Sequence, residues 1–221
     1  MAENFFDVGL DRNPANFQPL TPLTFLERSA AVFPDHTAII HGPLRRSYAA
    51  FYERTRQLGS ALASRFGIGR GDTVSVILLN TPAMLECHYG VPMCGGVLHS
   101  INTRLDAKVI AFQLDHAQAK VLIVDRECMA LAQQALQLAD VQPVLIQYDD
   151  PEFTELTEAV AADVLDYEAV IASGDANFDW LMPTDEWDAI SINYTSGTTG
   201  DPKGVVYHHR GAYLLAQGNA L

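Results

Sequence analysis

Short apolar runs alternate with helical patterns through the middle of the chain, and this rhythm restricts the fold more than any other feature. The apolar runs have the composition of buried strands and cover residues 72–79, 96–102, 119–125 and 143–149. Helical patterns lie between them at residues 81–90, 106–117 and 128–140. Strand, helix, strand at this spacing predicts an α/β fold with a mostly parallel sheet and helices on both faces.

The residues before this region predict two helices and a hairpin. Apolar side chains at helical spacing over residues 24–33 predict a short helix, which ends before Pro34. Two short extended runs on either side of Gly42 and Pro43 predict a hairpin. A second helix is expected over residues 48–66, where Ser47 provides an N-terminal cap and Gly67 a stop.

An acidic, weakly patterned segment follows the last of the alternating strands. It covers residues 149–188 and contains one helical pattern, at Leu165–Ala172. We interpret the segment as a connection between a first α/β lobe, about residues 20–148, and a second lobe that starts at residue 189. In the second lobe, strands are expected at residues 188–193 and 205–209, followed by a helix over residues 210–221.

Composition excludes several classes of function. The formal net charge of -13 argues against nucleic acid or an anionic membrane as a partner, because both require a basic surface. No apolar segment is long enough to span a bilayer, and the first residues do not resemble an export signal. The three cysteines show no CxxC spacing, so neither a disulfide framework nor a zinc site is expected. These observations favour a cytoplasmic protein.

The stretch YTSGTTGDPKGV, residues 194–205, has the most distinctive chemistry in the chain. Glycines permit close approach of the backbone, and hydroxyl side chains offer hydrogen bonds, so such a loop can fold around phosphate oxygens. Lys203, one of only three lysines, can supply the positive charge that a triphosphate requires, and a hydroxyl could reach Mg²⁺. The P-loop pattern G-x-x-x-x-G-K-[ST] fails here, because Pro202 precedes the lysine and Gly204 follows it.

The order S-G-T-T-G-x-P-K-G resembles the signature of the adenylate-forming enzymes, which include acyl-CoA synthetases, luciferases and peptide-synthetase adenylation domains. Upstream segments also resemble this family, among them GIGRGDTVSVILLNTPAMLECHYG and GGVLHSIN. The stretches YGVPMCGGVLHSINTRLD and VVYHHRGAYL are most similar to 3-methylmercaptopropionyl-CoA ligases, medium-chain acyl-CoA ligases and plant acyl-activating enzymes. The resemblance extends over almost the whole chain.

The resemblance implies an ATP-dependent acid:thiol ligase that works in two steps. A small carboxylic acid attacks the α-phosphate of ATP to give an acyl-adenylate and pyrophosphate, and coenzyme A then displaces AMP to form a thioester. By carry-over, the motif would cradle the β- and γ-phosphates of ATP with Thr195, Ser196, Gly197, Thr198, Thr199, Gly200, Lys203 and Gly204. Lys203 would also stabilise charge on the departing pyrophosphate, and Thr195 is the candidate for contacting Mg²⁺.

Members of this family contain further catalytic motifs downstream of this loop. The resemblance therefore implies that residues 1–221 are the N-terminal part of the AMP-binding domain of a longer ligase, and that they are catalytically incomplete alone. The alternative is a stand-alone nucleotide-binding or interaction module without catalysis. Because a sheet that stops here leaves an unpaired edge and exposed apolar surface, we also expect these residues alone to self-associate as a homo-oligomer, or to be less stable than the longer ligase.

Other residues that could carry chemistry have a structural interpretation. His208 and His209 are adjacent on an expected strand and so would point to opposite faces, which disfavours a shared metal. Either could instead line the acyl or nucleotide pocket at the strand end, but a structural role is favoured. Cys87 and Cys94 have the spacing of core residues on a helix. Structural roles are also expected for His88 and His99, and for Arg104 and Asp106 as an ion pair or a helix cap. Pro92 predicts an early end or a kink.

Overall fold

The computed structural model describes residues 5–153, 164–195 and 202–220. The strands are β1 (Thr37–His41), β2 (Leu44–Ser47), β3 (Thr73–Ile77), β4 (Val97–Ser100), β5 (Ala119–Asp125), β6 (Val144–Tyr148), β7 (Leu165–Asp166), β8 (Ala189–Thr195) and β9 (Lys203–His208). The α-helices are α1 (Leu23–Val32), α2 (Tyr48–Phe66), α3 (Pro82–Met93), α4 (Ala107–His116), α5 (Met129–Leu136), α6 (Tyr167–Ala172) and α7 (His209–Ala220), with short 3-10 turns at Phe5–Asp7 and Arg126–Cys128.

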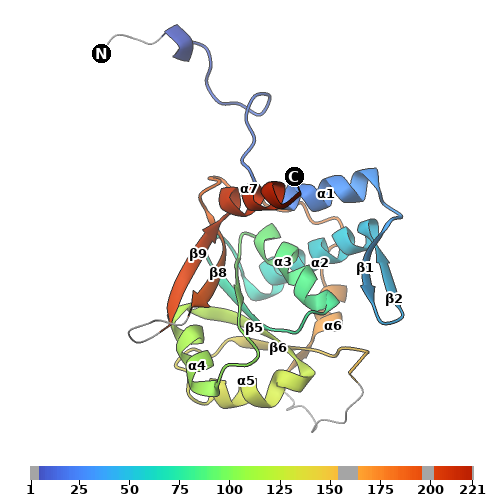
Figure 1. Ribbon diagram of the computed structural model, residues 1–221, viewed down its shortest axis with the longest axis vertical. Helices are drawn as coiled ribbons and strands as arrows, with labels where there is room; N and C mark the ends of the chain where they lie inside the picture. Colours follow the sequence, from blue (N-terminus) through green and yellow to red (C-terminus); the bar gives the residue numbers. More distant parts are fainter. Residues whose placement is uncertain (1–4, 154–163, 196–201, 221) are drawn as a thin grey trace.

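The main sheet confirms the predicted α/β class. Its strand order within the described residues is β7-β6-β5-β3-β4-β8-β9. Every pairing in it is parallel except the last, between β8 and β9. The order reverses around β3, because β4 lies on one side of it and β5 on the other. Right-handed crossovers that run in opposite directions along a sheet place their helices on opposite faces of it. Accordingly, α3 and α4 lie on opposite faces of this sheet (Figure 1).

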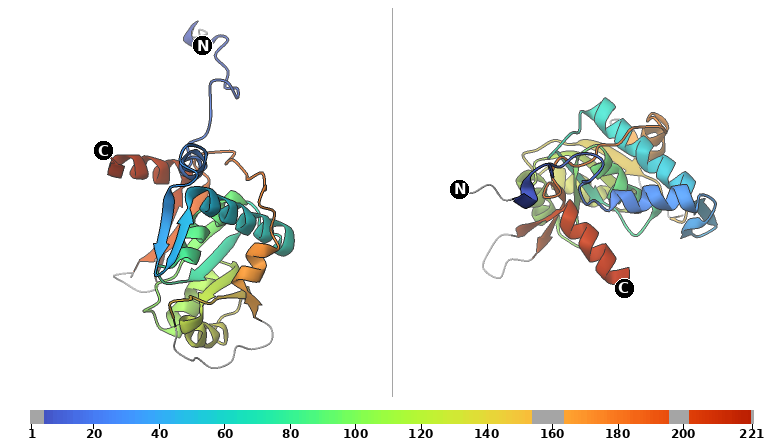
Figure 2. Two further views of the ribbon diagram at one scale, coloured as in Figure 1. Left: turned by 90° about the vertical axis from the view of Figure 1, so that its right-hand side faces the viewer. Right: turned by 90° about the horizontal axis from the view of Figure 1, so that it is seen from above.

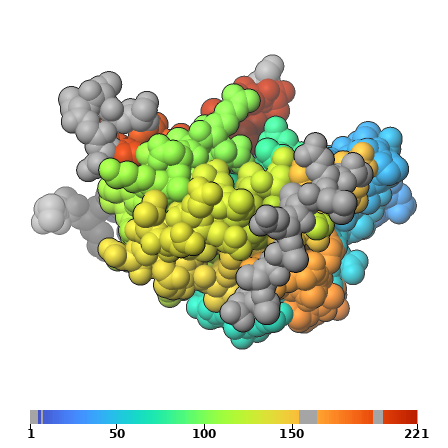
Figure 3. All heavy atoms as spheres, turned by 90° about the horizontal axis from the view of Figure 1, so that it is seen from below, coloured from blue at the N-terminus to red at the C-terminus, as the bar shows by residue number. Residues whose placement is uncertain are grey.

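Two apolar cores lie on the two faces of the sheet. Along β5, Val121 and Ile123 face the core that is covered by α2, α3 and α6. Leu122 and Val124 alternate with them and face the core that is covered by α4 and α5. Figure 3 shows the second face from outside, with α4 in green and α5 in yellow. Burial on both sides explains why these strands are almost continuously apolar.

Local signals predicted α2 correctly. The Ser47 side chain accepts a hydrogen bond from the Ala50 backbone N–H at 3.3 Å, which caps the first turn. Gly67 ends the helix in the left-handed region at φ 65°, a conformation that favours glycine. Asp106 likewise caps α4 by accepting from the Val109 N–H at 2.9 Å, as one of its two predicted roles required.

Several sequence predictions are wrong at an element boundary. β8 and β9 each extend two residues into the expected loop, to Thr195 and from Lys203. Leu165 and Asp166 form β7 rather than the first turn of a helix, because they pair with β6. The helix predicted over residues 128–140 ends at Leu136. His209 is not the end of a strand but the first residue of α7. Pro92 lies in the last turn of α3, which ends one residue later, in agreement with the early end that was predicted.

The hairpin of β8 and β9 forms one edge of the sheet, and α7 follows it. Figure 2 shows that α7 projects away from the body of the molecule. Several apolar side chains on this edge are exposed, including Val206 at 59% and Leu215 at 60%. Across the described residues, no helix is both long enough and apolar enough to cross a membrane.

Candidate functional site

The hairpin of β8 and β9 places the two ends of the sequence motif side by side. Thr195, the last residue of β8, lies directly opposite Lys203, the first residue of β9. Residues directly opposite in an antiparallel pair project to the same face. The hydroxyl of Thr195 and the ammonium of Lys203 therefore emerge together at the mouth of the loop. The remaining predicted ligands, Ser196, Gly197, Thr198, Thr199 and Gly200, lie outside the described residues.

Lys203 is available for a ligand. Its side chain is exposed, and it makes no ion pair with any residue that the structure describes. Lys120, by contrast, pairs with Asp72 at 2.6 Å. Its positive charge lies in a chain with a net charge of -13. It is suited to an anionic group such as a phosphate.

Gly204 leaves room for two side chains of the neighbouring strand. It lies opposite Tyr194 in the hairpin. A Cβ atom on Gly204 would lie 2.9 Å from Cδ1 of Ile192 and 3.4 Å from Cζ of Tyr194. The structure thus gives this motif glycine a packing role on the side of the hairpin that carries Tyr194.

A group of ring side chains next to the motif was not recognised from the sequence. The Tyr194 hydroxyl and the His116 Nδ1 are hydrogen-bonded at 2.6 Å. The Tyr194 ring also lies 5.0 Å from the ring of His99. His99 is fully buried, and its Nδ1 is hydrogen-bonded to the Ser75 hydroxyl at 2.9 Å. These residues are far apart in the chain, so neither spacing nor periodicity could reveal the contact.

The two adjacent histidines have separate structural roles. His209 is buried, and its Nδ1 is hydrogen-bonded to the Thr21 hydroxyl at 2.9 Å. His208 accepts a hydrogen bond at Nδ1 from the Gly211 N–H at 2.8 Å, and its ring lies 4.3 Å from that of Trp187. The separation predicted for the two rings therefore arises from a strand-to-helix junction and not from strand alternation.

The cysteines occupy the core, as their spacing predicted. Cys87, Cys94 and Cys128 are all free and buried. Burial raises the pKa of the Cys94 thiol to about 11, and that of Cys87 well above its usual value. Both side chains are therefore neutral thiols near pH 7, and they act as small apolar groups.

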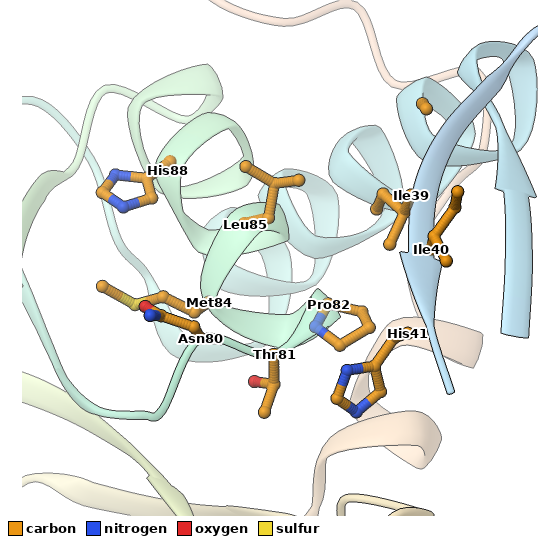
Figure 4. Close-up of a pocket in the computed structure, with 10 residues that line it drawn as sticks. Ile39, Ile40, His41, Asn80, Thr81, Pro82, Met84, Leu85 and His88 are labelled. Carbon is orange, nitrogen blue, oxygen red and sulfur yellow. The ribbon is translucent and has the colours of Figure 1, made fainter. Parts of the chain in front are cut away.

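A separate pocket of about 340 Å³ lies where β1 meets the first turns of α3 (Figure 4). Ile39, Ile40 and Leu85 are among its apolar lining residues. His41 and Thr81 contribute polar groups from the two sides. The position is near the carboxyl end of β3, where the strand order of the sheet reverses. Such a pocket can hold a small, mainly apolar group with hydrogen-bonding capacity at one end.

Comparisons with known proteins agree on the family. Residues 26–220 match the protein family that is described as "AMP-binding enzyme". The chain is 46% identical over 223 residues to the acetate/butyrate–CoA ligase AAE7 of Arabidopsis thaliana, with 96% of this chain and 39% of that protein covered. It is 44% identical over 216 residues to the acetate–CoA ligase CCL3 of Humulus lupulus, with 94% and 38% covered.

A solved structure has the same fold over most of this chain. The anthranilate–CoA ligase AuaEII, in complex with anthranoyl-AMP, superimposes with a TM-score of 0.81 at 23% identity over 93% of this chain and 38% of that chain. The chain thus spans about two-fifths of the length of these relatives. Because the family match covers most of its residues, the chain belongs to the AMP-binding enzyme family.

Proposed function

We propose that the hairpin of β8 and β9 binds the β- and γ-phosphates of ATP. One observation carries this proposal: the strand register sets Thr195 opposite Lys203 at the mouth of the motif loop. The end of β8 and the start of β9 thus bring a hydroxyl and an exposed ammonium to one face of the hairpin. Lys203 offsets the charge of the polyphosphate, and Thr195 is the proposed contact for a bound Mg²⁺. The loop residues between them, which the resemblance also implicates, would supply backbone N–H groups and hydroxyls.

We further propose that the chain is part of an AMP-forming acid–CoA ligase. Joining a carboxylate to ATP brings an anion to a polyanion, so positive charge and hydrogen-bond donors around the phosphates are needed to lower the barrier. Lys203 would stabilise the charge that develops on pyrophosphate. Relatives with about 45% identity are named for acetate and butyrate, which supports a short-chain acid as substrate and coenzyme A as acceptor.

The protein's compartment stays a prediction. The sequence favours the cytoplasm, whereas the Arabidopsis thaliana relative carries the word peroxisomal in its name. Self-association also stays a prediction, and the exposed apolar side chains of β9 and α7 support it. Light scattering of the purified chain measures it directly, because a stable monomer over a range of concentrations would contradict it.

The test of ATP binding uses isothermal titration of the 221-residue chain with ATP and Mg²⁺. Lys203→Ala is expected to weaken binding about tenfold or more, since a charge-assisted contact contributes about 1.5–3 kcal/mol. Lys108→Ala is the matched control, because it removes the same charge from α4. The proposal fails if the wild-type chain does not bind ATP, or if the two variants bind it equally well.

A second measurement separates a ligase fragment from a module with a function of its own. ATP–pyrophosphate exchange is followed with acetate and with butyrate, in the 221-residue chain and in the longer gene product. We expect exchange only in the longer product. Exchange by the 221-residue chain would show that it is catalytically complete. ATP binding without exchange in either form would favour a non-catalytic nucleotide-binding module.

A further inference from the structure

Tyr194 is held between two histidine rings immediately before the motif loop. Its ring meets His116 edge-on, with centroids 5.6 Å apart and planes at 83°, and the hydrogen bond of 2.6 Å joins the same two residues. On another side the His99 ring lies 5.0 Å away. A Cβ atom on Gly204, opposite Tyr194, would lie in van der Waals contact with Cζ of that ring, at 3.4 Å. The orientation of Tyr194 is therefore fixed from several directions.

His116 ties this tyrosine to a firmly packed helix. It is the last residue of α4, whose Ile110 and Leu114 are fully buried in the core under the sheet. The His116 ring also stacks on Phe112, one turn earlier, at 5.7 Å and 23°. The imidazole itself is exposed, so its position depends on the stack on Phe112 and on the hydrogen bond to Tyr194. Through this hydrogen bond, His116 restrains Tyr194 of β8, which lies 78 residues later in the chain.

The position of Tyr194 determines that of the next residue. Successive side chains on a strand point to opposite faces, so a rotation or slip of the strand at Tyr194 would also move Thr195. Thr195 in turn lies opposite Lys203. The contact between His116 and Tyr194 is the last tie between the body of the protein and β8 before the loop, among the residues that the structure describes.

We propose that His116 is a positioning residue for Thr195 and Lys203, at the two ends of the motif loop. It acts through the hydroxyl of Tyr194 and does not itself touch ATP. By holding the end of β8 in one orientation, it keeps Thr195 and Lys203 in the arrangement that the polyphosphate requires. This inference rests on the proposed function, because it assigns a role within the same ATP site.

The first test measures the ATP dissociation constant of the 221-residue chain, of four variants at His116 and Tyr194, and of one control variant. His116→Ala and Tyr194→Phe are each expected to weaken binding about three- to tenfold, the effect of losing one hydrogen bond. The double variant should bind no more weakly than the weaker single variant, since both changes remove the same contact. His116→Asn, which offers a side-chain acceptor close to the position of Nδ1, should recover most of the affinity. His36→Ala, at an exposed site, is the control.

The second test needs no ATP. Amide hydrogen exchange is compared between wild type and His116→Ala at residues 194, 195, 203 and 204, with β5 as the internal reference. We expect faster exchange in the hairpin and unchanged exchange in β5. If wild type fails to bind ATP, the proposed function fails, while the exchange result still decides whether His116 positions the hairpin. Unchanged exchange in the hairpin, additive effects in the double variant, or equal ATP affinity in wild type and His116→Ala would each overturn the inference.

Discussion

Glu86 accepts a hydrogen bond from the Nε of Arg54 at 2.7 Å, although the glutamate side chain is fully buried. Arg46 donates to the same Oε1 oxygen, and the Tyr167 hydroxyl donates to Oε2 at 2.8 Å. The outer side of the Arg54 guanidinium pairs with the more exposed Glu168. Four elements, β2, α2, α3 and α6, thus meet at one buried carboxylate.

Glu86→Gln is expected to lower the free energy of unfolding by about 3–5 kcal/mol, because it leaves two arginines at a buried site without their shared anion. Glu168→Gln is the matched control, and it should cost about 1 kcal/mol or less, because that carboxylate is 55% exposed. Urea denaturation followed by circular dichroism measures both. Equal stability of the two variants would show that the buried pair contributes no more than the surface pair.

Gly174, two residues beyond the end of α6, permits a close approach to the backbone of α2. A Cβ atom at this position would lie 2.0 Å from the backbone carbonyl oxygen of Gln57, which cannot move without distorting α2. Gly174→Ala is expected to destabilise the fold by about 1–3 kcal/mol through overpacking. Gly69→Ala, where the added Cβ meets nothing within 4 Å, should change stability by less than about 0.5 kcal/mol. Thermal unfolding of the two variants measures this difference in stability. Equal stabilities would show that α2 and the segment after α6 can move apart at no cost in free energy.

Local signals carried most of the fold. Ser47 and Gly67 define α2 through their own backbone and side-chain preferences, and the four buried strands are visible as apolar runs. The predictions were wrong where a residue that is distant in the sequence determines the local structure. Leu165 forms a strand because it lies beside Ile146 in β6, and His209 turns inward because the Thr21 hydroxyl is there to bind it.

In the candidate site too, local motifs could be predicted from the sequence, whereas contacts between distant residues could not. The motif predicted that Thr195 and Lys203 belong to a phosphate-binding loop, and the register of β8 and β9 sets the two residues opposite each other. The contact of His116 with Tyr194 joins two elements that the sequence leaves unconnected. The pocket between β1 and α3 is also invisible in the sequence, since its two walls come from segments separated by a long helix.

His209 is expected to make stability depend on pH in the acidic range. Burial lowers its pKa to about 4, whereas an unfolded chain has the ordinary value near 6.5. Below pH 6.5 the unfolded state takes up a proton that the folded state does not, so stability falls as the pH falls from 6.5 to 4. The loss attributable to this group is up to about 3 kcal/mol.

The variant His209→Asn keeps a hydrogen-bonding group for Thr21 but cannot titrate. Its free energy of unfolding, measured by urea denaturation between pH 4 and 8, should therefore fall less steeply toward acid than that of wild type. His36→Asn, at an exposed position, should retain the wild-type slope. A His209→Asn slope that matches wild type would mean that the buried imidazole does not control this range.

Asp125 is expected to produce the opposite slope. It lies at the carboxyl end of β5, is 1% exposed, and accepts a hydrogen bond from the Leu79 N–H through Oδ2. Its Oδ1 has no hydrogen-bond partner among the described residues. Burial raises the pKa of this carboxyl to about 7, from an ordinary value of 3.8. Between these two values the folded state holds a proton that the unfolded state has lost, so the contribution of Asp125 to stability is complete below pH 3.8 and disappears as the pH rises through 7.

Asp125→Asn removes this dependence, because an amide can still accept from Leu79 but carries no charge at any pH. The free energy of unfolding of Asp125→Asn relative to wild type should therefore increase by up to about 4 kcal/mol between pH 4 and 8. Asp140→Asn, at an exposed position, should show no such trend. Because the His209 and Asp125 effects have opposite signs and overlap between pH 4 and 6.5, the wild-type profile alone would conceal both. A flat difference between Asp125→Asn and wild type would show that the buried carboxyl titrates normally in the fold.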